Sequence, residues 1–168
     1  KVHVSGTSTL WKKADMYAGE SFSPDGKLLM LTTIQKPFSY IVPINRFPSK
    51  TIITDIAGKP IKTVNEVPLT EVMPKGFSAT REGKRNMNWR ADKPASLTYV
   101  VALDGGDPAK KVDFRDEVFS WDAPFDQAPK SLIKTAQRFT NIVWGNDKLA
   151  VITDSWYDTR NEKTYFFN

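Results

Sequence analysis

Three short runs of apolar and β-branched residues recur along the chain. They are Leu28–Ile34, Leu97–Ala102 and Leu149–Thr153, and each is apolar on both faces, as in a strand covered on both sides. No segment has a sustained helical period with capping residues, and the 11 prolines are scattered where long helices would have to run. The pattern predicts an all-β protein.

Turn-forming residues separate these runs. Proline sets φ, aspartate bonds the nearby backbone, and glycine takes left-handed conformations, so such clusters mark tight turns. They occur at Ser23–Gly26, Ala57–Lys59, Asp104–Asp107 and Gly145–Asp147. The chain therefore reads as many short strands joined by turns.

A repeat precedes the three strands: an aromatic residue, two spacers and an aspartate. The copies are Phe22 with Asp25, Trp89 with Asp92, and Trp144 with Asp147. A second, strand-ending aspartate follows the first two copies at the same interval of 30 residues, at Asp55 (55 − 25) and Asp122 (122 − 92). We interpret the repeated aromatic residues as packing between repeat units rather than as a ligand platform.

Units of four short antiparallel strands are typical of β-propeller blades. We predict a single partial β-propeller with two complete blades flanked by partial ones. Its parts are the end of a preceding blade at 1–16, a blade at 17–64, an inserted loop at 65–85, a blade at 86–135 and a partial blade at 136–168. A β-sandwich also has short strands and frequent turns, but the shared aspartate interval favours the propeller.

Composition narrows the function classes. The 168 residues, at 19.0 kDa, suit one domain, and no apolar run is long enough for a membrane-spanning helix, so we expect no membrane insertion. The net charge of +5 is spread along the chain rather than clustered, which argues against a nucleic-acid partner.

The absence of cysteine excludes disulfides and thiolate chemistry. Because the chain begins at Lys1 without an apolar leader, we expect that a preceding segment is missing.

The tag Ser23–Lys27 resembles the blade openings of prolyl oligopeptidase relatives and of TolB-like proteins. More specific stretches resemble the propeller of the glutamyl endopeptidase branch of the prolyl oligopeptidase superfamily of serine peptidases, known from bacteria and plant plastids. They are Thr33–Pro43, Arg46–Pro48, Asn88–Ala95, Ala102–Pro108 and Asp122–Phe125. The resemblance implies an N-terminal propeller followed by an α/β-hydrolase domain with a Ser, Asp and His triad, which cleaves after glutamate. None of that second domain is present in these 168 residues.

Catalytic machinery is not expected in the chain itself. His3 is the only histidine and lies in a terminal strand, and Ser78 lies in a sequence without the second glycine of a nucleophile elbow. Asp104, Asp107 and Asp113 lack the spacing of a cation loop and are explained by turn formation. We predict no catalytic residue, no metal and no cofactor.

Three arginines are candidates for binding a substrate carboxylate, since a glutamate-selective enzyme needs guanidinium partners. Arg85 and Arg90 belong to the basic stretch at and just after the inserted loop, which also contains Arg81 and Lys84, and Arg46 lies in a loop that follows strands of the first complete blade. A solvated charged loop is the competing interpretation of these residues.

Two functions remain open. The first is a non-catalytic propeller that gates and orients peptide substrates for the hydrolase domain of the same parent chain. The second is a stand-alone TolB-like propeller that acts as a protein-binding scaffold. The resemblance also favours an exported bacterial protein, and the unpaired blade edges at both ends predict self-association of the fragment by strand exchange.

Overall fold

The computed structural model describes residues 1–146 and 148–167. The chain forms two compact units, Lys1–Leu69 and Thr70–Asn168, which are described separately below. Within the described residues there is no α-helix, only one short 3-10 helix, η1, at Ile44–Arg46. No helix there is long and apolar enough to cross a membrane. The prediction of an all-β chain is confirmed.

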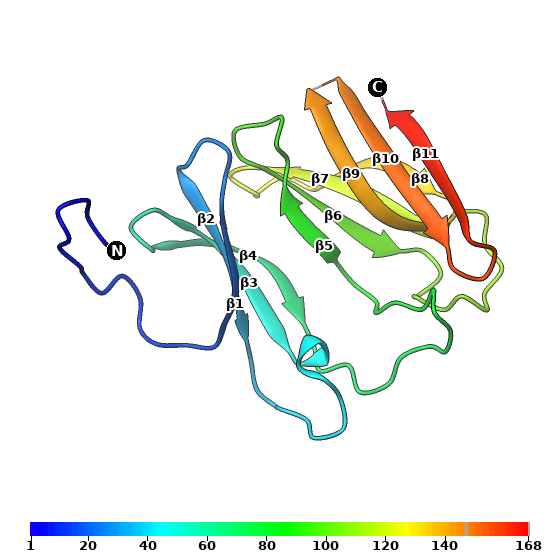
Figure 1. Cartoon of the computed structure of the whole chain (residues 1–168), viewed down its shortest axis with the longest axis horizontal. Helices are drawn as coiled ribbons and strands as arrows, with labels where there is room; N and C mark the ends of the chain where they lie inside the picture. The colour runs from blue at the N-terminus through cyan, green and yellow to red at the C-terminus, as the bar shows by residue number, and fades with distance from the viewer. Residues whose placement is uncertain (147, 168) are drawn as a thin grey trace. The chain divides into compact units, whose positions relative to one another are not determined.

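The first unit is one four-stranded antiparallel sheet in which neighbours in sequence are neighbours in space (Figure 1). Its strands are β1 (Tyr17–Phe22), β2 (Leu28–Ile34), β3 (Ser49–Asp55) and β4 (Pro60–Val67). Apolar side chains from three of these strands are buried: Leu29, Leu31, Ile53 and Val64. This sheet has the four antiparallel strands expected of a blade, and β4 ends at Val67 rather than at residue 64.

Residues 1–16 contain no extended strand. Val2 and Ser8 form an isolated antiparallel bridge, and the backbone N–H of His3 donates to the carbonyl of Thr7 at 2.8 Å. Two parts of the segment 1–16, around Val2 and around Ser8, therefore meet each other at the start of the chain. Their assignment to a preceding blade stays a prediction.

The second unit contains two antiparallel sheets (Figure 1). The first has the order β5 (Arg85–Trp89), β6 (Ser96–Ala102), β7 (Asp116–Asp122) and β8 (Lys130–Thr135). The second has β9 (Arg138–Asn146), β10 (Leu149–Trp156) and β11 (Asn161–Phe167). A buried cluster of Val100, Val118, Phe139 and Ile152 joins the two sheets. Burial of apolar side chains from both sides holds them together.

The repeated aromatic residues occupy the same place in each sheet. Phe22 is opposite Leu29, Trp89 is opposite Leu97, and Trp144 is opposite Ala150. Each partner is the second residue of the sheet's second strand. The strand-ending aspartates also correspond, because Asp55 pairs with Leu28 and Asp122 with Ser96, the first residues of β2 and β6. Asp147, the third repeated aspartate, lies outside the described residues.

One boundary differs from the prediction in a way that matters below. The segment between β4 and β5 covers residues 68–84, because Arg85 is the first residue of β5 rather than the end of a loop. A charged residue can begin a buried strand when a carboxylate lies opposite its guanidinium. The ion pair that makes this possible is part of the candidate site.

Candidate functional site

Buried charged residues gather where β5, β7 and β9 begin. Arg85, Asp116 and Arg138 are the first residues of these strands, Arg115 precedes β7, and Asp104 follows β6. Asp104 and Asp116 are fully buried, at 1% and 0% exposure. Buried carboxylates require paired, hydrogen-bonded partners, so this cluster must be a network rather than separate charges.

Asp116 accepts contacts from two strands of neighbouring sheets. Its carboxylate accepts a hydrogen bond from Nη1 of Arg138 at 3.1 Å and one from the backbone N–H of Phe139 at 2.7 Å. Arg85 forms a close ion pair with the same carboxylate. Asp116 thereby ties the start of β5 to the start of β9.

Arg138 also reaches the second carboxylate. Its Nη2 donates to Asp104 at 2.7 Å, where Nη1 of Arg115 donates at 2.9 Å and the backbone N–H of Gly106 at 2.9 Å. Burial raises the pKa of Asp104, but the hydrogen bonds from Arg138 and Arg115 outweigh burial, and its pKa lies below the usual 3.8. Asp104 is therefore a carboxylate held in its charged form.

The cluster carries more positive than negative charge. Arg85, Arg115 and Arg138 face Asp104 and Asp116, which leaves one guanidinium in excess among these five residues. Nη1 of Arg138 also donates to the carbonyl of Arg115, and its Nε donates to the carbonyl of Ser78 at 2.8 Å, so each of its three side-chain nitrogen atoms has an acceptor. The Nε of Arg85, in contrast, is buried without a hydrogen-bond partner among the described residues.

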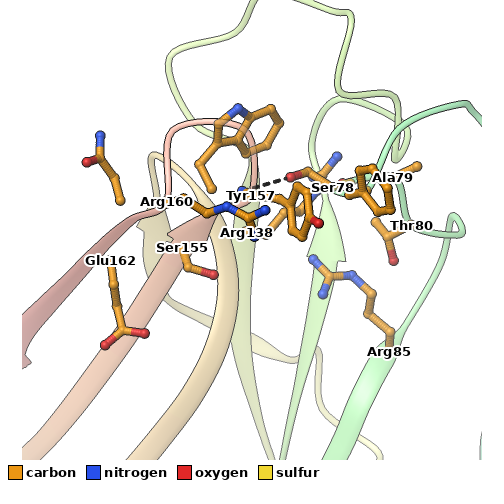
Figure 2. Close-up of a pocket in the computed structure, with 12 residues that line it drawn as sticks. Ser78, Ala79, Thr80, Arg85, Arg138, Ser155, Tyr157, Arg160 and Glu162 are labelled. Atoms are coloured by element: carbon orange, nitrogen blue, oxygen red, sulfur yellow. Dashed lines mark hydrogen bonds between the residues drawn. The ribbon is translucent and has the colours of Figure 1, made fainter.

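A pocket of about 460 Å³ opens beside this cluster (Figure 2). The loop at 77–80 forms one side, and β10, β11 and their connecting turn form another. The hydroxyl of Ser78 accepts the backbone N–H of Tyr157 at 3.2 Å, and Phe77 stacks on Tyr157 with ring centroids 4.3 Å apart. Charged residues in the lining are Arg85, Arg138, Arg160 and Glu162.

Arg90, at the other end of β5, is held by other contacts. Its Nε and Nη2 donate to the two oxygens of Asp92 at 3.0 and 2.6 Å, and its Nη1 donates to Ser120 at 3.2 Å. Its guanidinium lies 3.6 Å from the ring centroid of Trp144, on the neighbouring sheet. Arg90 is 4% exposed, so a substrate carboxylate would have to displace Asp92 to reach it. Its predicted substrate role stays untested, and the structure gives it a packing role.

Arg46 belongs to the first unit, at the end of η1, and is partly exposed. Arg85 and Arg90 belong to the second unit, where they lie at opposite ends of the five-residue strand β5. Of the three predicted arginines, only Arg85 lines the pocket. Its burial shows that it is not part of a solvated loop.

The other residues weighed for chemistry have local roles. His3 lies within hydrogen-bond distance of the Ser5 hydroxyl, at 2.9 Å, in the exposed N-terminal turn. Asp107 accepts the backbone N–H of Ala109 at 2.9 Å, as expected for a turn residue. No group of three or more potential metal ligands occurs in the described part of the chain.

Sequence reasoning singles out Arg85 but misses the other members of this cluster, which are Asp104, Arg115, Asp116 and Arg138. The sequence predicts a turn role for Asp104, and its carboxylate does accept the backbone N–H of Gly106. The available signal is a charged residue at the first position of a strand, which occurs at both Asp116 and Arg138. Such residues begin strands inside the protein only when they are paired.

No protein-family model matches the chain. Two curated plant proteins are similar to it, each named "Probable glutamyl endopeptidase, chloroplastic". The Oryza sativa subsp. japonica protein is 40% identical over 152 residues and the Arabidopsis thaliana protein is 36% identical over 152 residues. Each match covers 89% of this chain, which spans 16% of the length of each relative.

Solved structures of acylaminoacyl peptidases share the fold. The Pyrococcus horikoshii enzyme superposes with a TM-score of 0.57 at 12% identity, over 98% of this chain and 26% of that one. An acylaminoacyl peptidase in complex with Z-Gly-Gly-Phe-chloromethyl ketone gives a TM-score of 0.58 at 11% identity, over 99% and 26%. The predicted fold class, a partial β-propeller of four-stranded antiparallel blades, is confirmed. In sequence the chain resembles part of two proteins named as probable glutamyl endopeptidases, and in fold it resembles part of acylaminoacyl peptidases.

Proposed function

We propose that this chain is a non-catalytic propeller segment of a glutamyl endopeptidase-like serine peptidase. In this proposal it gates and orients peptide substrates for an α/β-hydrolase domain of the same parent protein. The observation that carries the proposal is the 40% identity, over 89% of this chain, to a protein named "Probable glutamyl endopeptidase, chloroplastic", of which this chain spans only 16%. A segment of that size suits a supporting part of a larger enzyme.

The two joined sheets of the second unit suit a gate. A gate must be rigid enough to exclude folded proteins and must open only when packed elements separate. Ile152, in β10, is 0% exposed and packs in the cluster shared by both sheets. Loosening that cluster should widen access without touching a catalytic group.

Hydrolysis of one glutamyl bond, placed in substrates of increasing size, tests gating in the intact protein. A capped pentapeptide and the same sequence within a folded carrier protein form the matched pair. We expect the unmodified protein to cleave the pentapeptide with a higher kcat/KM than the folded carrier. In Ile152→Ala we expect kcat/KM for the carrier to rise, so that the two values differ less. Truncation of a buried isoleucine costs about 2–5 kcal/mol of packing, enough to populate opened states. Ile61→Ala, at a 44% exposed position of the first unit, is the control.

Equal cleavage of both substrates by the unmodified protein would contradict gating. Absence of glutamyl hydrolysis in the intact protein would contradict the peptidase assignment and favour the stand-alone scaffold. We also expect His3→Gln to leave hydrolysis unchanged, because the only histidine of this chain bonds to Ser5 in an exposed turn. Loss of activity in that variant would place the general base in this chain.

A further inference from the structure

We propose that the pocket between the loop at 77–80 and the β10–β11 turn binds a carboxylate of a peptide, through Arg85 and Arg160. The peptide as ligand rests on the proposed function, whereas the preference for an anion rests on the pocket itself. The carboxylate is either an acidic side chain or a C-terminus, since both present the same group to guanidinium donors.

The excess of positive charge is the first reason. The buried cluster beneath the pocket has three guanidinium groups and two carboxylates, and Arg160 and Glu162 at the rim add one charge of each sign. Nearby Arg81 donates to the carbonyls of Glu82 and Lys84. Burial, together with the positive charge of Arg85, lowers the pKa of Arg81. Among the charged groups that form these ion pairs or line the pocket, guanidinium groups therefore outnumber carboxylates by one, which favours an added negative charge.

The unused donor of Arg85 is the second reason. Its side chain is only 10% exposed, and its buried Nε has no hydrogen-bond partner among the described residues. A buried donor without a partner costs free energy that a bound acceptor would recover. Arg85 projects toward the centre of the pocket, where Arg138 and Tyr157 also lie (Figure 2).

Arg160 supplies a second guanidinium at the opening. It lies in the exposed turn between β10 and β11, and its guanidinium carbon is 3.7 Å from the ring centroid of Tyr157. Tyr157 in turn stacks on Phe77 of the facing loop. This stack restricts the motion of Arg160 while its donors remain at the rim, which suits recognition of a planar carboxylate.

The pocket also has the size and lining that a peptide side chain needs. A volume of about 460 Å³ lies within the common range for ligand sites. Apolar surface comes from Phe77 and Trp156, and hydroxyl groups come from Ser78 and Ser155. A carboxylate with a short methylene stem would place its charge near the arginines and its stem against the rings.

Binding of three capped tripeptides to the intact protein tests the inference by calorimetry. One has a central Asp with an amidated end, one has a central Asn with an amidated end, and one has a central Asn with a free C-terminus. Aspartate is used so that binding is measured without glutamyl cleavage. We expect the fully neutral tripeptide to bind roughly 10- to 150-fold more weakly than at least one carboxylate form, as for loss of a charge-assisted contact. Which form binds identifies the source of the carboxylate.

Arg160→Gly is the main variant, since Arg160 adopts a left-handed φ of +58° that glycine accepts without strain. We expect it to reduce the preference for the carboxylate form by about 10-fold. Lys163→Gln removes the same charge from an exposed position of β11 outside the pocket lining and should leave binding unchanged. Hydrogen exchange should show peptide-induced protection at 77–80 and 155–162.

Equal binding of all three tripeptides, or an unchanged preference in Arg160→Gly, would overturn the inference. An equal effect of Lys163→Gln would do the same, because it would show net charge rather than the pocket to be responsible. The proposed function fails separately: a protein that binds the carboxylate tripeptide but hydrolyses no glutamyl bond would retain this site and lose the peptidase assignment.

Discussion

Asp116→Asn removes the carboxylate that joins two sheets of the second unit. In the structure Asp116 is 0% exposed and is paired with Arg85 and Arg138. Asparagine has nearly the same shape and can still accept the backbone N–H of Phe139, which lies 2.7 Å from the carboxylate. The substitution therefore isolates the loss of charge from the loss of volume.

The expected loss in the free energy of unfolding depends on the arginines that lose Asp116 as a partner. Arg138 keeps Asp104 at 2.7 Å, but Arg85 loses its ion pair and becomes an uncompensated buried charge. Breaking a buried ion pair on one side costs about 3–5 kcal/mol. Because the Phe139 hydrogen bond survives, we expect the lower end, about 3 kcal/mol, which corresponds to a roughly 150-fold increase in local opening.

Hydrogen exchange of the intact protein measures this opening locally. Amides of β9 and the neighbouring β10 should exchange roughly 150-fold faster in Asp116→Asn, and those of β1–β4, which belong to the other unit, should not change. The matched control is Asp126→Asn, the same chemical change at an exposed aspartate, for which we expect less than about 0.5 kcal/mol.

The double variant Arg85→Met with Asp116→Asn gives the critical comparison. If the cost of Asp116→Asn comes from the stranded guanidinium, removing Arg85 as well should recover part of the lost stability. The reasoning would be refuted if the free-energy cost of the double variant, measured by hydrogen exchange, equalled the sum of the costs of the two single variants. The stability would then come from shape at Asp116 rather than from charge.

Three further predictions concern other parts of the fold. Gly106→Ala should destabilise the second unit by well over the ~1 kcal/mol expected for Gly26→Ala, because its Cβ would lie 1.9 Å from the carbonyl oxygen of Thr80, whereas Gly26 has open space at a similar φ. Arg90→Lys should cost about 1–3 kcal/mol and speed exchange around Trp144, since lysine cannot make the bidentate contact. The ionised Asp104 contributes to folding stability above its ordinary pKa of 3.8, and this contribution is lost as pH falls toward its lowered folded-state pKa. The temperature of thermal unfolding should therefore depend less on pH in Asp104→Asn than in the unmodified protein between about pH 2 and pH 5.

The blade pattern could be predicted because its signals are local. At the first turn, the Asp25 carboxylate accepts the Ser23 hydroxyl at 2.6 Å and the backbone N–H of Lys27 at 3.1 Å, so five consecutive residues contain the whole turn. The strands that follow are apolar runs with the same local character. The same turn and strand form wherever the same residues recur in the sequence. Phe22, Trp89 and Trp144 accordingly occupy the same register position in their three sheets.

The candidate site could not be predicted in the same way, because its partners are far apart in sequence. Arg85 pairs with Asp116 and Arg138 with Asp104, and no spacing rule relates these positions. Arg90 and Asp92 are two residues apart, yet the stacking of Arg90 on Trp144 depends on the neighbouring sheet. The sequence could therefore single out arginines as a class but not distinguish a structural arginine from an available one.

The structure does make that distinction, and it separates two measurable roles. The donors of Arg138 are used by Asp104, Asp116 and two backbone carbonyls, so its substitution should lower stability before it affects any ligand. Arg160 is exposed at the pocket rim, and its substitution by glycine should affect binding without loss of stability. Arg85 shares both roles, because it pairs with Asp116 while its Nε lacks a partner among the described residues. Every side-chain nitrogen of Arg138 has an acceptor, whereas Nε of Arg85 has none among the described residues. Such a network can hold two blades together and still accept an anion, since the excess charge remains on the side that faces the pocket.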